Sequence, residues 1–493
     1  MRIVIDLQGC QTASRFRGIG RYSLALVQAM ARQAGGHEIW LALNGRLADS
    51  IIDIRSAFDG LIPPERIRVF EVSGPTAEID PANTGRARAA ELIREQFLAT
   101  LSPDIIYISS LFEGSSDNAV TSVGRLAMGE NCAVTLYDLI PLVHRDHYLV
   151  DEQYRNWYLR KLQSLKNAGL LLAISEYSRR EAIDVLALPE DRVVNISAGL
   201  DAQFRQLEIS PEQEMVLRRR YSLSRKFVLY TGGIDYRKNI EGLIEAYALL
   251  PYSIRREQQL AIVCKIEDPD RRRLQLQAKK AGLQDGELVL TGFVPDEELV
   301  AIYNLCALFV FPSLHEGFGL PPLEAMACGA PAIGSNVTSI PEVIGWDEAL
   351  FDPHDPKAIA AKMQQALTDE GFRAALRAHG LRQAKNFSWE TSARRALEAL
   401  EELHRRRAAS SIHVICSGRR PRLAYISPLP PEKTGIADYS AELIPELARF
   451  YEIELISDQP EVSDPWLAAN FPLRPVAWFE ANRERYDRLL YHF

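Results

Sequence analysis

A glycine-rich stretch in the second half of the chain carries two carboxylates at a spacing that could serve one ligand. Residues 312–335 read PSLHEGFGLPPLEAMACGAPAIGS, with seven residues between Glu316 and Glu324. The pattern predicts a strand that ends at Pro312 and a helix that begins near Pro321, which places the glycines at a helix N-terminus. Amides there carry partial positive charge and bind phosphate or sugar hydroxyls. The stretch therefore predicts a small-molecule site, although two surface carboxylates at this spacing are common by themselves.

A second stretch supplies the cations that an anionic ligand would need. Residues 230–239 read YTGGIDYRKN, in which Gly232 and Gly233 allow a tight turn before Arg237 and Lys238. Two adjacent basic residues are most often a solvated surface. Here they follow a strand whose carboxyl end faces the expected crevice of an open parallel sheet. We therefore expect both side chains to donate charge-assisted hydrogen bonds to phosphate oxygens.

The N-terminal part of the chain carries weaker signals. The turn RFRGIGRY (15–22) contains Gly18 and Gly20 but lacks the third glycine of a dinucleotide motif. Asp138 precedes Pro141 and either binds a substrate hydroxyl or caps the turn. His144 and His147 follow, and two loop histidines at this spacing are expected to lie in solvent rather than to bind metal.

An Asp-x-Asp pair is the feature closest to a divalent-cation site. Asp268 and Asp270 flank Pro269 and are followed by three arginines, 271–273, which compete for the same carboxylates. A helix N-terminus with Asp268 as its cap and proline at the first position explains these residues more simply. We predict no metal in the site and no cofactor.

Short apolar runs alternate with helical stretches along the chain, which predicts parallel sheets covered by helices on both faces. The runs are 2–6, 37–43, 104–110, 133–139 and 170–175, and then 226–233, 260–265, 288–293, 308–312 and 330–335. Two doubly wound, Rossmann-like lobes with a cleft between them are the expected α/β fold. The polar segment 205–225 separates them.

An internal repeat indicates a further segment of the same kind. RGIGRYSLALVQAMAR (17–32) aligns without gaps with TGIADYSAELIPELAR (434–449), and both follow a strand. Three strands are visible there, at 423–427, 453–457 and 488–493, which suggests the truncated start of a second copy of the first lobe. The expected organisation is a first lobe at 1–205, a second lobe at 206–387, a closing helix at 388–407, a linker at 408–421 and the partial copy at 422–493.

Composition excludes several classes of protein. The 493 residues suggest about three compact units at roughly 150 residues each, and a net charge of −8 argues against nonspecific binding to nucleic acid. The six cysteines lack metal-ligand spacing and favour a reducing, cytosolic compartment. No apolar stretch reaches the ~18 residues of a spanning helix. We expect a chain that is neither exported nor integral to a membrane.

Over residues 1–405 the motifs resemble family 4 of the retaining glycosyltransferases, which have the two-lobed GT-B fold. The resemblance implies that Glu316 meets the donor sugar near its reacting carbon and that Glu324 holds the nucleotide ribose. It implies that sugar hydroxyls and diphosphate contact the amides of Gly317, Phe318, Gly319 and Leu320. The loop 292–295, with Val294, would read the base through main-chain groups.

The same resemblance assigns residues elsewhere in the cleft, with two departures from the family pattern. Gly18, Gly20 and Arg21 would face the donor phosphates and the acceptor, with Asp138 on the acceptor side. Gly233 stands where many relatives have arginine, which would shift the phosphate contacts to Arg237 and Lys238. Tyr137 stands where many relatives have histidine, which removes any histidine-based role there.

The N-terminal sequence and the second copy resemble the bacterial mannosyltransferases that build polymannose O-antigen chains. This implies transfer of mannose from GDP-mannose to a glycan, with retention and an α linkage. It further implies a lipid-linked acceptor, contact with the inner membrane face through the basic clusters 218–220 and 405–407, and an assembly partner protein. Two alternatives stay open: another GT-B enzyme, such as one with a different hexose donor, a hydrolase or an epimerase, and a noncatalytic scaffold.

Overall fold

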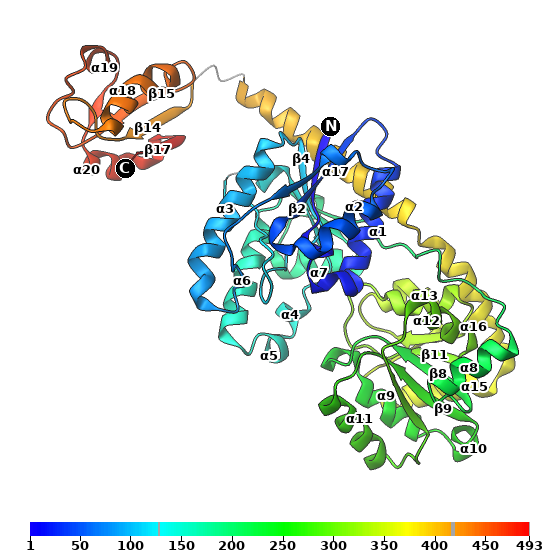
Figure 1. Cartoon of the computed structure of the whole chain (residues 1–493). Helices are drawn as coiled ribbons and strands as arrows, with labels where there is room; N and C mark the ends of the chain where they lie inside the picture. Colours follow the sequence, from blue (N-terminus) through cyan, green and yellow to red (C-terminus); the bar gives the residue numbers. More distant parts are fainter. Residues whose placement is uncertain (127–128, 416–419, 493) are drawn as a thin grey trace. The chain divides into compact units, whose positions relative to one another are not determined.

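The structure is a computed structural model that describes residues 1–126, 129–415 and 420–492, with the backbone alone over 409–415. The chain divides into two compact units, Met1–Arg407 and Ala408–Phe493. Two parallel sheets organise the first unit and one organises the second (Figure 1). The fold is α/β, and the first unit consists of two doubly wound lobes.

A seven-stranded parallel sheet forms the first lobe, in the order β3-β2-β1-β4-β5-β6-β7. The strands β1 to β7 span Arg2–Asp6, Glu38–Asn44, Ile67–Phe70, Ile105–Ile108, Cys132–Leu136, Leu170–Ala173 and Val193–Asn195. The helices α1 to α7 span Gly18–Arg32, Ile51–Ala57, Thr84–Thr100, Ile140–Val143, Arg145–Tyr148, Glu152–Lys166 and Glu176–Leu186. Every residue of β4, β5 and β6 is buried, which is why these strands read as continuous apolar runs.

A six-stranded parallel sheet forms the second lobe, in the order β10-β9-β8-β11-β12-β13. The strands β8 to β13 span Lys226–Thr231, Gln258–Val263, Leu288–Gly292, Leu308–Phe311, Ala332–Ser335 and Leu350–Phe351. The helices α8 to α16 span Pro211–Arg220, Ile240–Ala248, Tyr252–Arg255, Asp268–Lys280, Asp296–Leu305, Leu320–Ala327, Ile340–Ile344, Pro356–Thr368 and Glu370–Gln383. Because β8 pairs with β11, the strand order reverses between them, and the loops that follow these two strands lie side by side.

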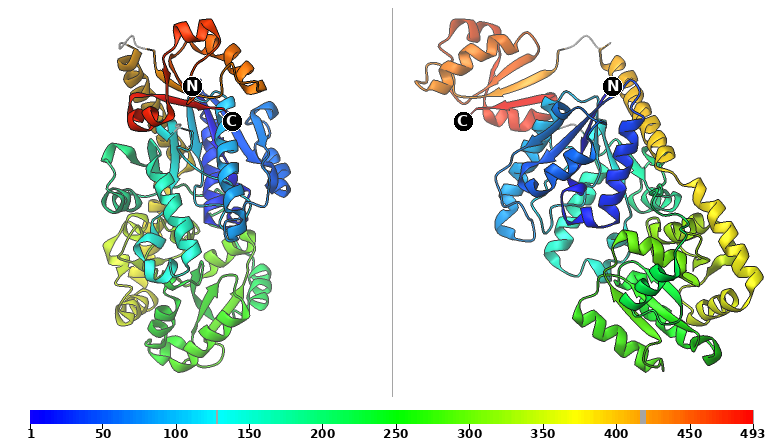
Figure 2. Two further views of the ribbon diagram at one scale, coloured as in Figure 1. Left: turned by 90° about the vertical axis from the view of Figure 1, so that its left-hand side faces the viewer. Right: turned by 45° about the vertical axis from the view of Figure 1, so that its right-hand side comes forward.

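The long helix α17, Trp389–Ile415, follows the second lobe and returns to the first (Figure 2). Ser388 accepts a hydrogen bond from the amide of Thr391 at 3.1 Å and so caps the start of the helix. The Trp389 indole donates to Asp201 at 2.8 Å, and Arg406 pairs with Asp191 of the first lobe at 2.8 Å. The helix thus ties both lobes together, and it extends past residue 407, where we expected it to end.

The segment between the lobes is more ordered than its polar sequence indicates. Residues 205–225 contain the helix α8, which begins at Pro211. Ser210 and Gln213 form a reciprocal capping box at its start, which satisfies two backbone donors. A helix forms here because the capping signal outweighs the lack of an apolar face.

The second unit repeats the topology of the first lobe. Its sheet has the order β16-β15-β14-β17, which matches β3-β2-β1-β4 strand for strand. The strands β14 to β17 span Arg422–Ile426, Glu452–Ile456, Leu473–Arg474 and Arg488–Tyr491, and the helices α18 to α20 span Gly435–Leu447, Pro465–Asn470 and Val476–Asn482. The structure therefore holds four strands here, one more than the three that we expected.

The described cysteines are all buried, and no disulfide joins Cys10, Cys132, Cys264, Cys306 and Cys328. Cys416 lies outside the described residues. In the part of the chain that the structure describes, no helix combines the length and the apolar character needed to cross a membrane.

Candidate functional site

Glu316 is the centre of a buried cluster of charges. It lies in the loop after β11, and Arg237 and Lys238 lie in the loop after β8. The guanidinium of Arg237 donates to one carboxylate oxygen at 2.7 Å, and the ammonium of Lys238 donates to the other at 2.6 Å. Three residues that the sequence places 78 and 79 positions apart therefore meet because β8 and β11 are neighbours.

The two cations decide the ionisation of this carboxylate. Burial alone would raise the pKa of Glu316, but the charges of Lys238 and Arg237 outweigh it and lower the pKa to about 2. Burial also lowers the pKa of Lys238, against the attraction of Glu316. The residues Glu316 and Lys238 are only 7% and 8% exposed. Asp235, which is exposed, also pairs with Arg237 at 3.2 Å, so the two cations of the cluster face two carboxylates. Their remaining N–H donors can bind a further, anionic partner such as a phosphate.

Backbone amides extend the cluster towards α13. None of the amides of residues 317–320 donates a hydrogen bond within the described part of the chain. Gly319 has φ +116°, a conformation that side chains rarely adopt, and α13 starts at Leu320, one residue before the expected start. Pro321 and Pro322 offer no N–H, so the free donors of this helix end lie in the loop itself. The Phe318 ring packs on Phe387 at 5.6 Å, which leaves only its backbone for a ligand.

Glu324 belongs to a different set of contacts. Its Oε2 accepts a hydrogen bond from the Tyr303 hydroxyl at 2.9 Å, and Tyr303 in turn lies 2.7 Å from the hydroxyl of Thr231. Burial raises the pKa of Glu324 to about 7, although Tyr303 and the charge of Arg21 favour the ionised form. This carboxyl therefore titrates near neutrality, whereas Glu316 stays ionised.

Arg21 reaches across from the first lobe. It lies in the first turn of α1 and forms an ion pair with both carboxylate oxygens of Asp296, the first residue of α12. Gly20 is required by packing, since a Cβ there would lie 2.3 Å from the Cα of Arg15, whereas Gly18 has open space around it. The glycine-rich turn is thus held against the loop that precedes α12.

That loop holds the residue expected to lie beside the nucleotide base. Gly292 has φ +81°, and Val294 is buried at 5% exposure. The ring of Phe293 between them is 71% exposed. Gly233, in the loop after β8, lies against Asp235, whose Oδ2 would be 3.2 Å from an added Cβ.

Asp138 and the following histidines adopt roles within the protein. The amide of Ile140 donates to Asp138 at 3.0 Å, so this carboxylate caps the turn before Pro141, and burial raises its pKa. His144 was expected in solvent, but its Nε2 lies 3.1 Å from Nδ1 of His315 in the second lobe. His147 is exposed and stacks on Tyr236 at 3.9 Å. Contacts between the lobes, which no local pattern encodes, explain both arrangements.

The Asp-x-Asp pair lies in the first turn of α11. Glu267, rather than Asp268, occupies the N-cap position, so the expected register was off by one residue. Asp270 accepts hydrogen bonds from Arg273 at 3.2 Å. Among the described residues no group of three or more His, Cys, Asp or Glu side chains is arranged to hold a metal ion. The absence of a metal requirement stays a prediction.

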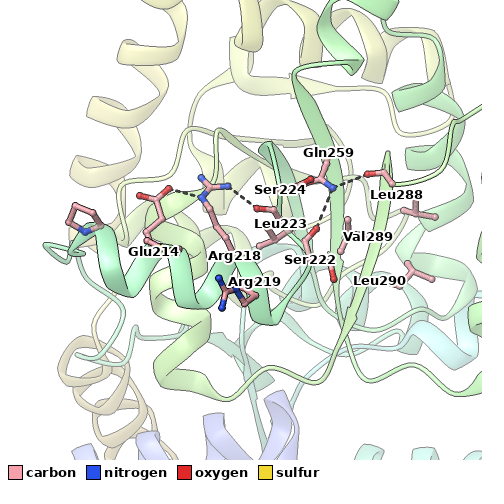
Figure 3. A pocket seen from close by; sticks show the side chains of 13 residues that line it. Glu214, Arg218, Arg219, Ser222, Leu223, Ser224, Gln259, Leu288, Val289 and Leu290 are labelled. Atoms are coloured by element: carbon pink, nitrogen blue, oxygen red, sulfur yellow. Dashed lines mark hydrogen bonds and ion pairs between the residues drawn. The ribbon is translucent and has the colours of Figure 1, made fainter.

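A surface groove of about 850 Å³ lies elsewhere on the second lobe, between α8 and β10 (Figure 3). Arg218 bonds to Glu214 on its rim, and Gln259 donates to the carbonyl oxygen of Ser222. None of the residues assigned to the site from the sequence lines it. The groove adds no member to the site.

Sequence reasoning missed the partners that position the predicted residues. Tyr303, Asp296 and His315 each contact a predicted residue or adjoin one. Tyr303 and Asp296 follow the loop 292–295, but nothing in their spacing reveals which lobe or strand they face.

Comparisons with known proteins agree with this geometry. The family described as Glycosyl transferases group 1 matches residues 218–383, which include Arg237, Lys238, Glu316 and Glu324. The O-antigen chain mannosyltransferase B of Escherichia coli is 32% identical over 388 residues, which cover 78% of this chain and 96% of that protein. The chain belongs to the group 1 glycosyltransferases.

Two further similarities extend this family assignment. The serotype-specific mannosyltransferase WbdA of Escherichia coli is 42% identical over 404 residues, which cover 82% of this chain. The chain spans only 48% of the length of WbdA. Among solved structures, WaaG, a glycosyltransferase involved in lipopolysaccharide biosynthesis, matches with a TM-score of 0.56 and 16% identity over 81% of this chain and 99% of that chain. This structural likeness identifies the fold of the glycosyltransferase as GT-B.

Proposed function

We propose that the chain is a retaining mannosyltransferase that moves mannose from GDP-mannose to a hydroxyl of a polymannose O-antigen glycan and forms an α linkage. The main support for this proposal is that Arg237 and Lys238 both bind Glu316, beside the free backbone amides of residues 317–320. The names of the similar proteins, a mannosyltransferase WbdA and an O-antigen chain mannosyltransferase, support the choice of sugar and acceptor.

The residues of the cluster suit departure of a nucleoside diphosphate. As the bond between the anomeric carbon and the diphosphate breaks, negative charge develops on the leaving oxygen. Arg237 and Lys238 are already ordered by Glu316, so they stabilise that charge without reorganising. The free amides of the loop add donors for the phosphate oxygens or sugar hydroxyls.

Glu316 and Glu324 have separate tasks in this proposal. Glu316 is ionised over the physiological range and stabilises positive charge on the sugar ring, next to its reacting carbon. Glu324 accepts hydrogen bonds from the ribose hydroxyls when it is ionised. The ion pair between Arg21 and Asp296 joins the first lobe to the end of the loop 292–295. In this proposal the base and the acceptor bind at the border of the two lobes.

The decisive experiment is product analysis. The chain is incubated with a panel of sugar nucleotides and oligomannoside acceptors, and the linkage and anomeric configuration of the product are determined by NMR. We expect an α-mannoside from GDP-mannose, with chelator added throughout to test the predicted independence of metal. Free mannose without a transferred product, or a product from another hexose alone, would contradict the proposal.

The roles of the cations are tested by substitution. Arg237→Ala and Lys238→Ala are each expected to lower kcat about 100-fold or more, the usual cost of losing one donor to developing charge. Lys226→Ala is the matched control, because Lys226 is exposed at the opposite end of β8. A wild-type transfer rate in Arg237→Ala or in Lys238→Ala would contradict the proposed role of that residue in stabilising the leaving diphosphate.

A lipid-linked acceptor, an assembly partner protein and contact with the inner membrane face complete the proposal. Several arginines of the two basic clusters have partners within the protein: Arg218 pairs with Glu214, Arg220 with Glu298 and Arg406 with Asp191. Membrane contact would have to compete with these pairs. Co-sedimentation with anionic vesicles tests it, and an absence of binding would remove the membrane contact while leaving the transfer reaction intact.

A further inference from the structure

The helix α7 of the first lobe makes several contacts with the second lobe, among them an edge-to-face contact of Tyr177 with the His315 ring at 5.5 Å. Glu342 of α14 accepts hydrogen bonds from the amides of Glu176 and Tyr177, at 3.0 and 3.2 Å. The hydroxyl of Ser178 lies 3.0 Å from the carbonyl oxygen of Gly317. A carboxylate oxygen of Glu181 lies 3.1 Å from Nε2 of His315. The helix α7 thus contacts the residue before Glu316 and the residue after it.

These contacts flank Glu316 without touching it. His315 is the residue before Glu316 and Gly317 is the residue after it, so Glu181 and Ser178 hold the two neighbours of the carboxylate. The carbonyl oxygen of His315 also accepts from Arg237 at 3.1 Å. Any displacement of His315 therefore moves both the backbone of Glu316 and one of its cationic partners.

The contact between Glu181 and His315 is buried, but the two side chains are not aligned for a hydrogen bond. Glu181 is 7% exposed and His315 is 3% exposed. His315 Nδ1 faces Nε2 of His144, while its Nε2 has no aligned hydrogen-bond acceptor despite the nearby carboxylate. Buried polar groups normally find a partner, and a small shift of the ring would align this one with Glu181.

We propose that Glu181 and His315 are a pair of positioning residues that sets the loop of Glu316 when the two lobes come together on the donor. Neither residue touches the sugar or the diphosphate in this proposal, which rests on the transferase function proposed above. Because Glu181 belongs to the first lobe, the pair makes the geometry of the reacting groups depend on the closed arrangement of the lobes.

The experiment compares Glu181→Ala with Asp184→Ala in the full chain. Asp184 lies on the same helix but is exposed, so it controls for loss of an acid from α7. We expect Glu181→Ala to lower kcat about tenfold or more, as small misplacements of reacting groups do. The KM for GDP-mannose and its affinity by calorimetry should change by less than about threefold, because no donor contact is lost. Asp184→Ala should stay within about twofold of the wild type.

Substitution of the partner keeps the test valid if Glu181→Ala folds poorly. His315→Gln retains an N–H that can reach Glu181, whereas His315→Ala does not, so kcat should be recovered in the former and lost in the latter. In a double-mutant cycle, His315→Ala should add little to Glu181→Ala in kcat, since both remove the contact between Glu181 and His315. Glu181→Ala also removes the acceptor of the Leu139 amide, which lies 3.2 Å from Glu181, so its stability is compared separately.

The outcomes separate the positioning role from the transferase function. Equal kcat in Glu181→Ala and Asp184→Ala, or equal loss in His315→Gln and His315→Ala, overturns the positioning role alone. The positioning role is also overturned if Glu181→Ala weakens donor binding and leaves kcat unchanged. A wild-type chain that transfers no mannose overturns the transferase function and, with it, the role of the pair.

Discussion

Arg21 of the first lobe and Asp296 of the second form an ion pair that joins the start of α1 to the start of α12. Each side chain is about one-third exposed, at 36% and 32%. Exposed pairs contribute about 1 kcal/mol or less, so this contact holds the lobes lightly. It also joins the glycine-rich turn to the loop proposed to bind the base.

We predict that Arg21→Gln weakens donor binding by several-fold without changing the stability of the fold. Removal of the ion pair between Arg21 and Asp296 releases the loop 292–295 from the first lobe, so the KM for the donor should rise. The dependence of this KM on salt concentration should become weaker, because salt then has no pair to screen. Arg17→Gln is the control, since Arg17 is exposed and lies on the same turn. Steady-state kinetics at low and high salt provide the measurement, and identical salt profiles for wild type and Arg21→Gln would contradict the prediction.

Glu316 should make the fold sensitive to acid. Its pKa is lowered from 4.5 to about 2 by Lys238 and Arg237, against the effect of burial. The native state therefore holds fewer protons than the unfolded state between these values, and the stabilisation is present above pH 4.5 and is lost as the pH falls towards 2. A shift of this size corresponds to about 3 kcal/mol.

We predict that Glu316→Gln flattens the dependence of unfolding free energy on pH between 5 and 2 and lowers stability at pH 7. The buried Lys238 would then lack its carboxylate, which is strongly destabilising, and Arg237 would keep its pair with Asp235 alone. Denaturant titrations of both proteins across this range provide the measurement. A variant with the acid dependence of the wild type would show that the carboxylate is not paired as described.

Glu324 should give the stability of the fold the opposite dependence on pH. Burial raises its pKa from 4.5 to about 7, so the native state holds an extra proton between these values. Its contribution to stability is therefore lost as the pH rises from 4.5 through about 7. Donor binding should improve over the same interval, because an ionised carboxylate accepts hydroxyl hydrogen bonds more strongly.

We predict that the KM for GDP-mannose falls as the pH rises through about 7 and that Glu324→Gln abolishes this dependence. The variant should also be more stable than the wild type at pH 8, because it carries no buried charge there. Kinetics and denaturant titration at matched pH values measure both effects. A KM that varies with pH equally in both proteins would assign the titration to another group.

Gly317 is expected to tolerate no side chain. A Cβ at this position would lie 2.3 Å from the carbonyl oxygen of Tyr137 in the first lobe. We predict that Gly317→Ala separates the lobes or displaces the loop of Glu316 and lowers kcat about 100-fold. Gly85→Ala, a glycine with open space around it, is the matched control. Near-normal transfer by Gly317→Ala would show that the lobes need not approach this closely.

The strands that the sequence missed all lie at the edges of their sheets, whereas most of those that it located are central. The pattern located the central strands of each sheet because they are buried on both faces, as β4 and β11 are. It missed β3, β7, β13 and β16, all of which are edge strands, although it located β10 and β17, which also lie at sheet edges. Edge strands here are short and partly exposed, and β16 spans only Leu473 and Arg474 between two prolines. Half-solvated strands of this length have no continuous apolar run to detect.

The sequence by itself determined which residue types could do chemistry at Glu316, Glu324, Arg237 and Lys238, because glycines, prolines and charges at strand ends constrain the local backbone. Only the tertiary structure decided how they combine. The pairing of β8 with β11 brought the cations to Glu316, and packing with Tyr303 and Thr231 separated Glu324 from them. The pKa values of about 2 and 7 for two glutamates of one motif follow from these neighbours. Ionisation depends on burial and on charges brought close in space, and neither is a property of the local sequence.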